Sequence, residues 1–257
     1  MNRLRNYYSF YQIEGLSDRF KGEIIQRKLQ VISKCLRSFT QCSLKYLDAG
    51  CAEGHYVQEL ALSENVCLAI GLDISLPKLL KAKNVTRKGK GLDKCQFIHA
   101  SWNYLPFKDE SFDVVTFFEG LEHSLNPYVP LNEIKRVLNK EGTLVISTPV
   151  SVFPLIIPEL IEVFVNKFLF LITGCIFRGH LNWFTPSKLQ EVLSSNFRIV
   201  CWDLNIPRHS LVKNMEVLLE AVMEKILSLL GNFFRTINKS VRKSDYMFDA
   251  ILVLKPR

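Results

Sequence analysis

The stretch "YLDAGCAEGHYVQEL", residues 46–60, decides the fold expected of this chain. A short apolar run ends in Asp48, and small residues then recur at every second position, as Gly50, Ala52 and Gly54, before a helical pattern begins. A backbone that turns tightly beside a ligand needs small residues of this kind. The stretch therefore predicts a strand, a ligand-binding turn and a helix.

The segments around this turn predict an α/β fold. Runs rich in Val, Ile and Phe alternate with helical segments as far as Pro149, and a helical period over residues 17–39 indicates a leading helix within residues 1–43. Such alternation favours a mostly parallel sheet with helices on both faces, in which ligands bind beyond the carboxyl ends of the strands. Later strands near residues 197–204 and 246–255 complete the sheet. We expect one domain over residues 1–257.

Two apolar segments interrupt the alternation, at residues 151–180 and 207–244. The first has charged residues and prolines, and a single membrane crossing there would separate strands of one sheet, so a hairpin or helical lid is favoured over a membrane span. The second contains an amphipathic helical stripe, which fits packing on the domain, an interfacial membrane helix or a dimer face. Both are predicted to be lid-like insertions, and peripheral membrane contact stays open.

Composition limits the partners and the location. The formal charge of +8 favours anionic partners, but the basic residues form no ribbon interleaved with aromatics, so no nucleic-acid partner is expected. The seven cysteines include no C-x-x-C pair, so neither a disulfide framework nor a metal site is predicted. The first residues lack the apolar core of a secretory signal. We expect a cytoplasmic protein, in solution or at the membrane surface, of open oligomeric state.

The spacing within the turn separates the ligand classes that use a strand-turn-helix. A phosphate-binding P-loop requires Lys after the last glycine, whereas His55 follows Gly54. A dinucleotide fingerprint has a different glycine spacing, and Asp48 would repel a pyrophosphate. An acid at this place suits a ligand that carries an ammonium group.

Five segments in order resemble the class I S-adenosylmethionine-dependent methyltransferases. "LDAGCAEG" resembles their first motif, D-x-G-x-G-x-G with Ala for the middle glycine, and "GLDIS" resembles their second. "FIHASWNYLPFKDESFDVVTFFEGLEHSLNP" resembles the adenine-pocket turn and fourth strand, "LNKEGTLVISTP" the lead into the fifth strand, and "GHLNWFTPSKLQEVLSSNFRIV" the segment before the sixth. Together they cover residues 44–200.

The resemblance implies a class I methyltransferase (Rossmann-like) fold with a seven-stranded sheet, and S-adenosyl-L-methionine (SAM) as cofactor. Asp73 would hold the ribose hydroxyls, and Glu119 would face the methionine part. Ser101 stands where the family usually has an acid and can still bond the adenine amino group, while Trp102 would stack on the ring. The residues expected to bind the cofactor are Asp48, Gly50, Cys51, Ala52, Gly54, Asp73, Ile74, Ser101, Trp102 and Glu119.

The implied chemistry is attack by a small-molecule or lipid-like acceptor, at oxygen, on the sulfonium methyl group. Because the sulfonium is already reactive, alignment and exclusion of water are the main demands, and a dedicated base is not required. His123 and His180 are the candidate catalytic residues; alternatively, His123 orients its loop and His180 anchors the lid. A sugar or other soluble acceptor, and a non-catalytic SAM-binding protein, stay open. The glycine spacing disfavours a nicotinamide-dependent oxidoreductase.

Overall fold

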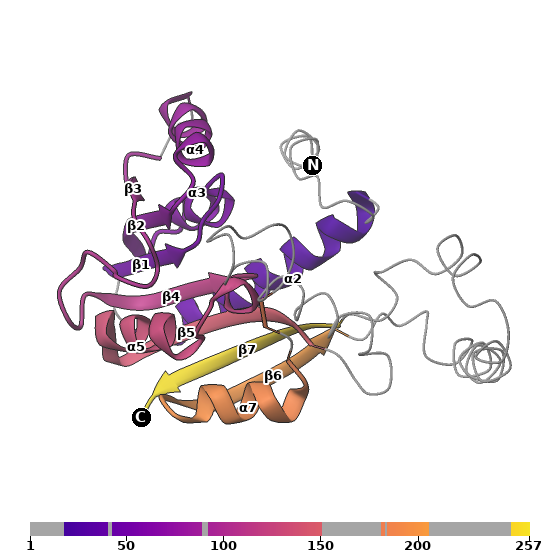
Figure 1. The fold of residues 1–257 in the computed structure, drawn as a ribbon. Coiled ribbons are helices and arrows are strands. Elements are labelled where there is room, and N and C mark those ends of the chain that lie inside the picture. The colour runs from indigo at the N-terminus through magenta and orange to yellow at the C-terminus, as the bar shows by residue number, and fades with distance from the viewer. Residues whose placement is uncertain (1–17, 41–42, 89–91, 151–180, 183, 206–247) are drawn as a thin grey trace, which may run out of the picture.

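A computed structural model describes residues 18–40, 43–88, 92–150, 181–182, 184–205 and 248–257. The described helices and strands follow one another along the chain as drawn in Figure 1. In order they are α2 (Asp18–Arg37), β1 (Leu44–Ala49), α3 (His55–Ala61), β2 (Val66–Asp73), α4 (Leu76–Lys88), β3 (Cys95–His99), β4 (Phe112–Phe118), the 3-10 helix η1 (Leu121–His123), α5 (Tyr128–Val137), β5 (Leu138–Val150), α7 (Pro186–Ser194), β6 (Phe197–Asn205) and β7 (Phe248–Pro256).

The strands form one seven-stranded sheet in the order β3-β2-β1-β4-β5-β7-β6. Every pairing from β3 to β5 is parallel, and β7 runs antiparallel to both of its neighbours. The predicted mostly parallel sheet is therefore confirmed. Because β1 pairs with both β2 and β4, the strand order reverses at β1, and ligands bind at such a point in open α/β sheets.

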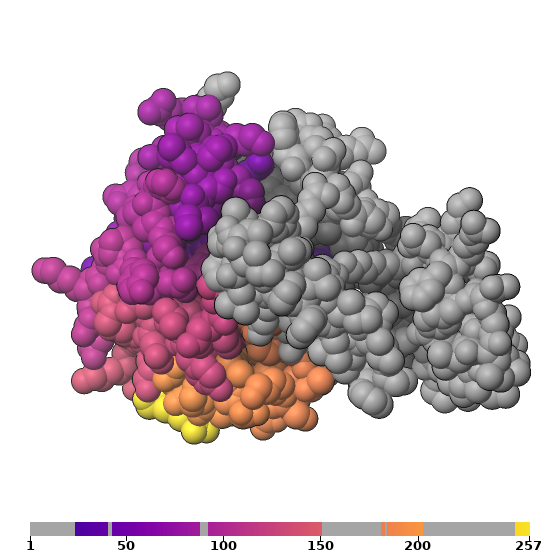
Figure 2. All heavy atoms as spheres, viewed as in Figure 1, coloured from indigo at the N-terminus to yellow at the C-terminus, as the bar shows by residue number. Residues whose placement is uncertain are grey.

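Helices cover both faces of the sheet. On one face, α2, α3 and α4 share a core to which they contribute Ile32, Leu60 and Leu79. On the other face, α5 and α7 contribute Ile134 and Leu189 to a second core. On the side of the molecule shown in Figure 2, the purple surface that includes α3 and α4 lies at the opposite end from the orange and yellow surface of α7 and β7, as the strand order requires.

Of two helices whose bounds were expected from the sequence, one agrees with the expectation and one is longer. The leading helix lies inside the expected range, at Asp18–Arg37. The helix expected near residues 77–83 runs over Leu76–Lys88, because neither glycine nor proline follows Pro77 before Gly89. Thr86 also donates its hydroxyl to the carbonyl of Ala82, which satisfies a polar group inside this helix.

The predicted insertions at 151–180 and 207–244 lie outside the described residues, as does the start of the leading segment. Their lid role and the single-domain organisation stay predictions. None of the helices in the described ranges has the length and apolar character needed to span a membrane.

Candidate cofactor site

The turn after β1 has the conformation that its small residues predicted. The φ angles of Gly50, Ala52 and Gly54 are 90°, 49° and 76°, all in the left-handed region that favours glycine. The main-chain N–H groups of Gly50 and Cys51 donate to the carbonyl of Leu72, at 2.7 and 2.9 Å. The turn is thereby fixed against the carboxyl end of β2.

Aromatic rings enclose this turn. A Cβ added to Gly54 would lie 2.3 Å from the ring of Phe97, so any side chain at this position would require that ring to shift. A Cβ on Gly50 would lie 3.2 Å from the ring of Trp102. The structure thus brings Trp102 beside the turn, next to the residues with which it was expected to form a site.

Asp48 is the buried acid of this site, with 1% of its surface exposed. Its Oδ1 accepts a 2.8 Å hydrogen bond from the Thr116 hydroxyl, which also shares a 2.6 Å hydrogen bond with the hydroxyl of Tyr46. Within the described part of the chain, its Oδ2 is buried and has no hydrogen-bond partner. Burial raises the pKa of Asp48 to about 7; the Thr116 hydrogen bond lowers it, nearby Asp73 raises it and Lys28 lowers it.

Asp73 connects the end of β2 to the turn. Its Oδ2 accepts a 2.8 Å hydrogen bond from the N–H of Ala52, and its Oδ1 accepts one of 2.8 Å from the N–H of Ser75. Each carboxylate oxygen retains acceptor capacity, so these bonds leave room for a hydroxyl group of a ligand. The neighbouring Ile74 exposes 64% of its surface, and its carbonyl lies 2.8 Å from Nε2 of His99.

Glu119 lies just past the end of β4, also with a left-handed backbone, at φ 49°. Its Oε1 accepts a 2.6 Å hydrogen bond from the Ser147 hydroxyl and a 2.8 Å hydrogen bond from Nζ of Lys28. Its main-chain N–H donates to the carbonyl of Ser147 at 3.0 Å. The carboxylate is therefore fixed from both α2 and β5.

Lys28 was missed by the sequence reasoning. It is 4% exposed, on the face of α2 that includes Ile25 and Ile32, and its Nζ lies 5.2 Å from the centre of the Phe118 ring. The sequence did contain a sign that Lys28 is buried and paired, since this lysine interrupts the apolar stripe of the leading helix. A lysine within such a stripe is seldom fully buried unless it is paired.

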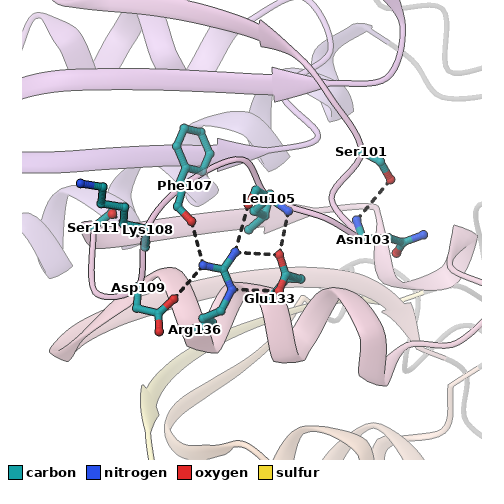
Figure 3. Close-up of polar contacts among 9 residues, drawn as sticks. All are labelled: Ser101, Asn103, Leu105, Phe107, Lys108, Asp109, Ser111, Glu133 and Arg136. Atoms are coloured by element: carbon teal, nitrogen blue, oxygen red, sulfur yellow. Dashed lines mark hydrogen bonds and ion pairs between the residues drawn. The ribbon is translucent and has the colours of Figure 1, made fainter.

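The turn that the resemblance assigned to the adenine pocket is held by α5 (Figure 3). Arg136 donates to the carbonyls of Leu105 and Phe107, at 3.0 and 2.7 Å, and to both oxygens of Glu133. Glu133 in turn accepts from the N–H of Leu105 at 2.8 Å. Ser101, at the start of this segment, accepts a 3.2 Å hydrogen bond from the N–H of Asn103.

Glu122 and His123, which follow β4, differ in exposure. Glu122 is buried, where it accepts a 2.9 Å hydrogen bond from the hydroxyl of Thr148, and its carbonyl accepts from the N–H groups of Leu181 and Asn182. Adjacent His123 is exposed on η1. The second candidate, His180, lies outside the described residues.

The assembled residues fit the cofactor that the resemblance implied. Asp48 offers a buried carboxylate oxygen without a partner, as an ammonium group requires. Asp73 is at the end of the adjacent strand, and Trp102 covers the turn between them. An amino acid joined to a nucleoside contains an ammonium group, a ribose and a base, which these residues can bind in that order.

A comparison with protein families decides the classification. A family model described as a methyltransferase domain matches residues 41–226 of this chain. The chain belongs to this methyltransferase family. The match includes the turn after β1 and the carboxyl ends of β2 and β4, where the candidate site lies, so the predicted family is confirmed.

Curated relatives of the methyltransferase domain match over part of their length. A cycloartenol-C-24-methyltransferase from Arabidopsis thaliana is 31% identical over 134 residues, which are 51% of this chain and 39% of that relative. A demethylmenaquinone methyltransferase from Clavibacter sepedonicus is 44% identical over 66 residues, which are 24% of this chain and 27% of that relative. The chain thus spans less than half the length of either relative.

A solved structure supports the fold of the methyltransferase domain. A putative sarcosine dimethylglycine methyltransferase from Galdieria sulphuraria aligns with a TM-score of 0.66, and the alignment covers 99% of this chain and 98% of that chain. Their sequences are 14% identical. At this identity the likeness shows the shared fold.

Proposed function

We propose that this chain is a SAM-dependent methyltransferase that acts on a lipid-like small molecule. The observation that carries the proposal is the buried Oδ2 of Asp48, which lacks a hydrogen-bond partner among the described residues and lies beside the glycine turn. A buried carboxylate oxygen in this state is costly unless a charged donor reaches it. The ammonium group of the methionine moiety is such a donor.

The residues divide the binding of the cofactor among three strand ends. Asp48, at the end of β1, takes the ammonium group, and Asp73, at the end of β2, takes the ribose hydroxyls. Trp102 and Ser101 flank the base. SAM, when bound, supplies a methyl group on a positively charged sulfur, ready for in-line displacement.

The protein's remaining tasks are to align the acceptor and to take up its proton. The acceptor atom would gain the methyl carbon that the cofactor supplies, and the electron pair of the broken carbon–sulfur bond would stay on the sulfur. For a hydroxyl acceptor, a proton must also leave. His123 is exposed, and histidine is the side chain that most often serves as a general base, so we propose it as the proton acceptor.

A lipid-like acceptor is supported by two of the relatives. They are named for methylation of a sterol, cycloartenol, and of a quinone, demethylmenaquinone. Oxygen is the acceptor atom that we expected from the sequence, and the C-24 position named for one relative makes carbon the competing atom. Mass spectrometry of the methylated product, with fragment analysis, separates the two.

Calorimetric titration with SAM and S-adenosylhomocysteine (SAH) tests the cofactor. We expect the parent to bind both ligands, with binding lost in Asp73→Ala and Gly50→Val but retained in Lys188→Ala, a variant of an exposed residue on α7. A folded parent that binds neither ligand would refute the proposal. Transfer of labelled methyl from SAM to a lipid extract then tests the activity, and tight binding without transfer to lipid or soluble extracts indicates a non-catalytic binding protein.

A further inference from the structure

Lys28 is a buried cation from a helix that precedes every recognised motif. Its ammonium group lies 2.8 Å from Oε1 of Glu119, and the side chain of Lys28 is 5% exposed. Ser147 donates to the same oxygen, at 2.6 Å. The contact joins α2 to the ends of β4 and β5, on the edge of the sheet where the cofactor site lies.

Packing alone does not explain a lysine at this position. Transfer of an ammonium group out of water is costly, and apolar residues of similar volume often serve the stability of a fold equally well or better. Lys28 also lies on the apolar face of α2, next to positions occupied by Ile25 and Ile32. A methionine at this position would continue the apolar stripe. The stability of the fold therefore does not require the positive charge, which indicates another role for it.

The charge faces a group of carboxylates. Asp48, Asp73 and Glu119 lie at the ends of three adjacent strands, and Lys28 acts electrostatically on Asp48 as well as bonding Glu119. Neighbouring carboxylates repel one another and resist ionisation, and Asp73 acts on Asp48 in this way. Lys28 therefore favours the ionised form of Asp48 and fixes the orientation of Glu119.

We propose that Lys28 is a positioning residue for the methionine end of the cofactor, acting through Glu119 and Asp48. The inference rests on the proposed function, because it presumes a ligand with an amino-acid moiety. It makes α2 part of the cofactor site, although α2 contains none of the motif residues. The nucleoside end of the ligand is bound by other residues and does not depend on Lys28.

A pair of ligands tests this division. SAH has the amino-acid moiety, whereas 5′-methylthioadenosine has the same nucleoside and thioether but lacks it. In Lys28→Met, calorimetry should show SAH affinity reduced about tenfold or more, which is the usual effect of losing a charge-assisted hydrogen bond. The affinity for 5′-methylthioadenosine should change less than about twofold, within the range of surface substitutions.

Matched variants separate positioning from folding. Lys34→Met removes an exposed lysine from the same helix and should leave both affinities unchanged. Glu119→Gln removes the charge of the partner and should also weaken SAH selectively, so it serves as the test if Lys28→Met does not fold. In the double variant the loss should be smaller than the product of the two single losses, because the two residues act as a unit.

The other outcomes are decisive as well. Equal weakening of both ligands in Lys28→Met would mean a structural role, and unchanged SAH affinity would mean no role; either overturns the inference. If the folded parent binds 5′-methylthioadenosine and SAH equally well, the amino-acid moiety is not recognised and the inference also fails. If the folded parent binds neither ligand, the proposed function itself fails.

Discussion

Thr116 donates a 2.8 Å hydrogen bond to Oδ1 of Asp48, whereas Oδ2 of the same carboxyl is buried with no hydrogen-bond partner in the described ranges. Burial, as the largest effect, raises the pKa of this carboxyl to about 7. The charged groups that act on it are Asp73 from β2, which raises the pKa, and Lys28 from α2, which lowers it. Without ligand, the site therefore holds a carboxylate in an unfavourable environment.

Asp48→Asn should stabilise the ligand-free protein at pH 8. The folded-state pKa of Asp48 lies above its unfolded value, so the folded protein holds a proton that the unfolded chain releases between about pH 4 and pH 7. The contribution of the Asp48 carboxyl to the free energy of unfolding of the parent therefore falls as the pH rises through that window. Urea denaturation should show the variant more stable by an amount on the order of a few kcal/mol at pH 8, and by little at pH 4.

His55 also has a pKa that differs between the folded and the unfolded chain, but its contribution to stability is the same in the parent and in Asp48→Asn. Burial lowers the pKa of its imidazole to about 4, so His55 stabilises the fold above its unfolded pKa and loses this effect as pH falls towards 4. The parent and the Asn variant share this contribution, so it cancels in their difference. An equal stability difference at pH 4 and pH 8 would contradict the assignment of the elevated pKa to Asp48.

The affinity for SAH should depend on pH through Asp48. An ionised carboxylate is needed for the ammonium group, so affinity in the parent should fall by up to about tenfold per unit as pH drops below 7. In Asp48→Asn, affinity should be weak and nearly independent of pH between 5.5 and 8. Calorimetry in buffers of differing ionisation enthalpy measures the proton release directly, and a parent that binds equally well at pH 5.5 and pH 8 would exclude this role.

Gly54→Ala should unfold the turn more readily than Gly50→Ala. The added Cβ would lie 2.3 Å from the Phe97 ring at position 54 but 3.2 Å from Trp102 at position 50, and both backbones have positive φ. We expect a loss of about 2–4 kcal/mol at position 54 and about 1–2 kcal/mol at position 50. The reverse order in urea denaturation would show that Phe97 moves aside easily.

Arg136→Lys should loosen the turn between β3 and β4. The guanidinium bonds two carbonyls, of Leu105 and Phe107, and pairs with Glu133, a fork that an ammonium group cannot reproduce. We expect a stability loss of about 1–3 kcal/mol and weaker binding of 5′-methylthioadenosine. Lys188→Ala removes an exposed ion pair with Glu191 and serves as the control, in which no measurable change is expected.

The features that could be predicted from the sequence are those whose residues lie close together along the chain. Gly50, Ala52 and Gly54 lie within one short turn, so their spacing indicated the strand-turn-helix that the structure has, while the ammonium ligand inferred for Asp48 stays a prediction. The alternation of strands and helices indicated the sheet, because each parallel pairing requires a crossover of this kind. The structure places Trp102 beside the turn, and its stacking on the base stays a prediction.

The contacts that hold the site together could not be predicted in the same way. Lys28 and Glu119 are 91 residues apart, and Tyr46 and Thr116 are 70 apart, so only the completed sheet brings them together. Glu122 and Thr148 are 26 residues apart, and the hydrogen bond between them also forms only when β5 lies beside β4. None of these three contacts has a local sequence pattern.

The place of β7 in the sheet has a consequence for how this chain is made. β7 lies between β5 and β6, yet its residues 248–256 are synthesised after both of them. The four strands around the cofactor turn, β1 to β4, can pair as soon as they emerge from the ribosome. The edge of β5 that pairs with β7, in contrast, stays unpaired until β7 emerges from the ribosome. β6 also cannot join the sheet before then, because it pairs with β7. A nascent chain that stalls before residue 248 would therefore present the completed cofactor turn together with an unpaired strand edge, the form most exposed to aggregation and to chaperones.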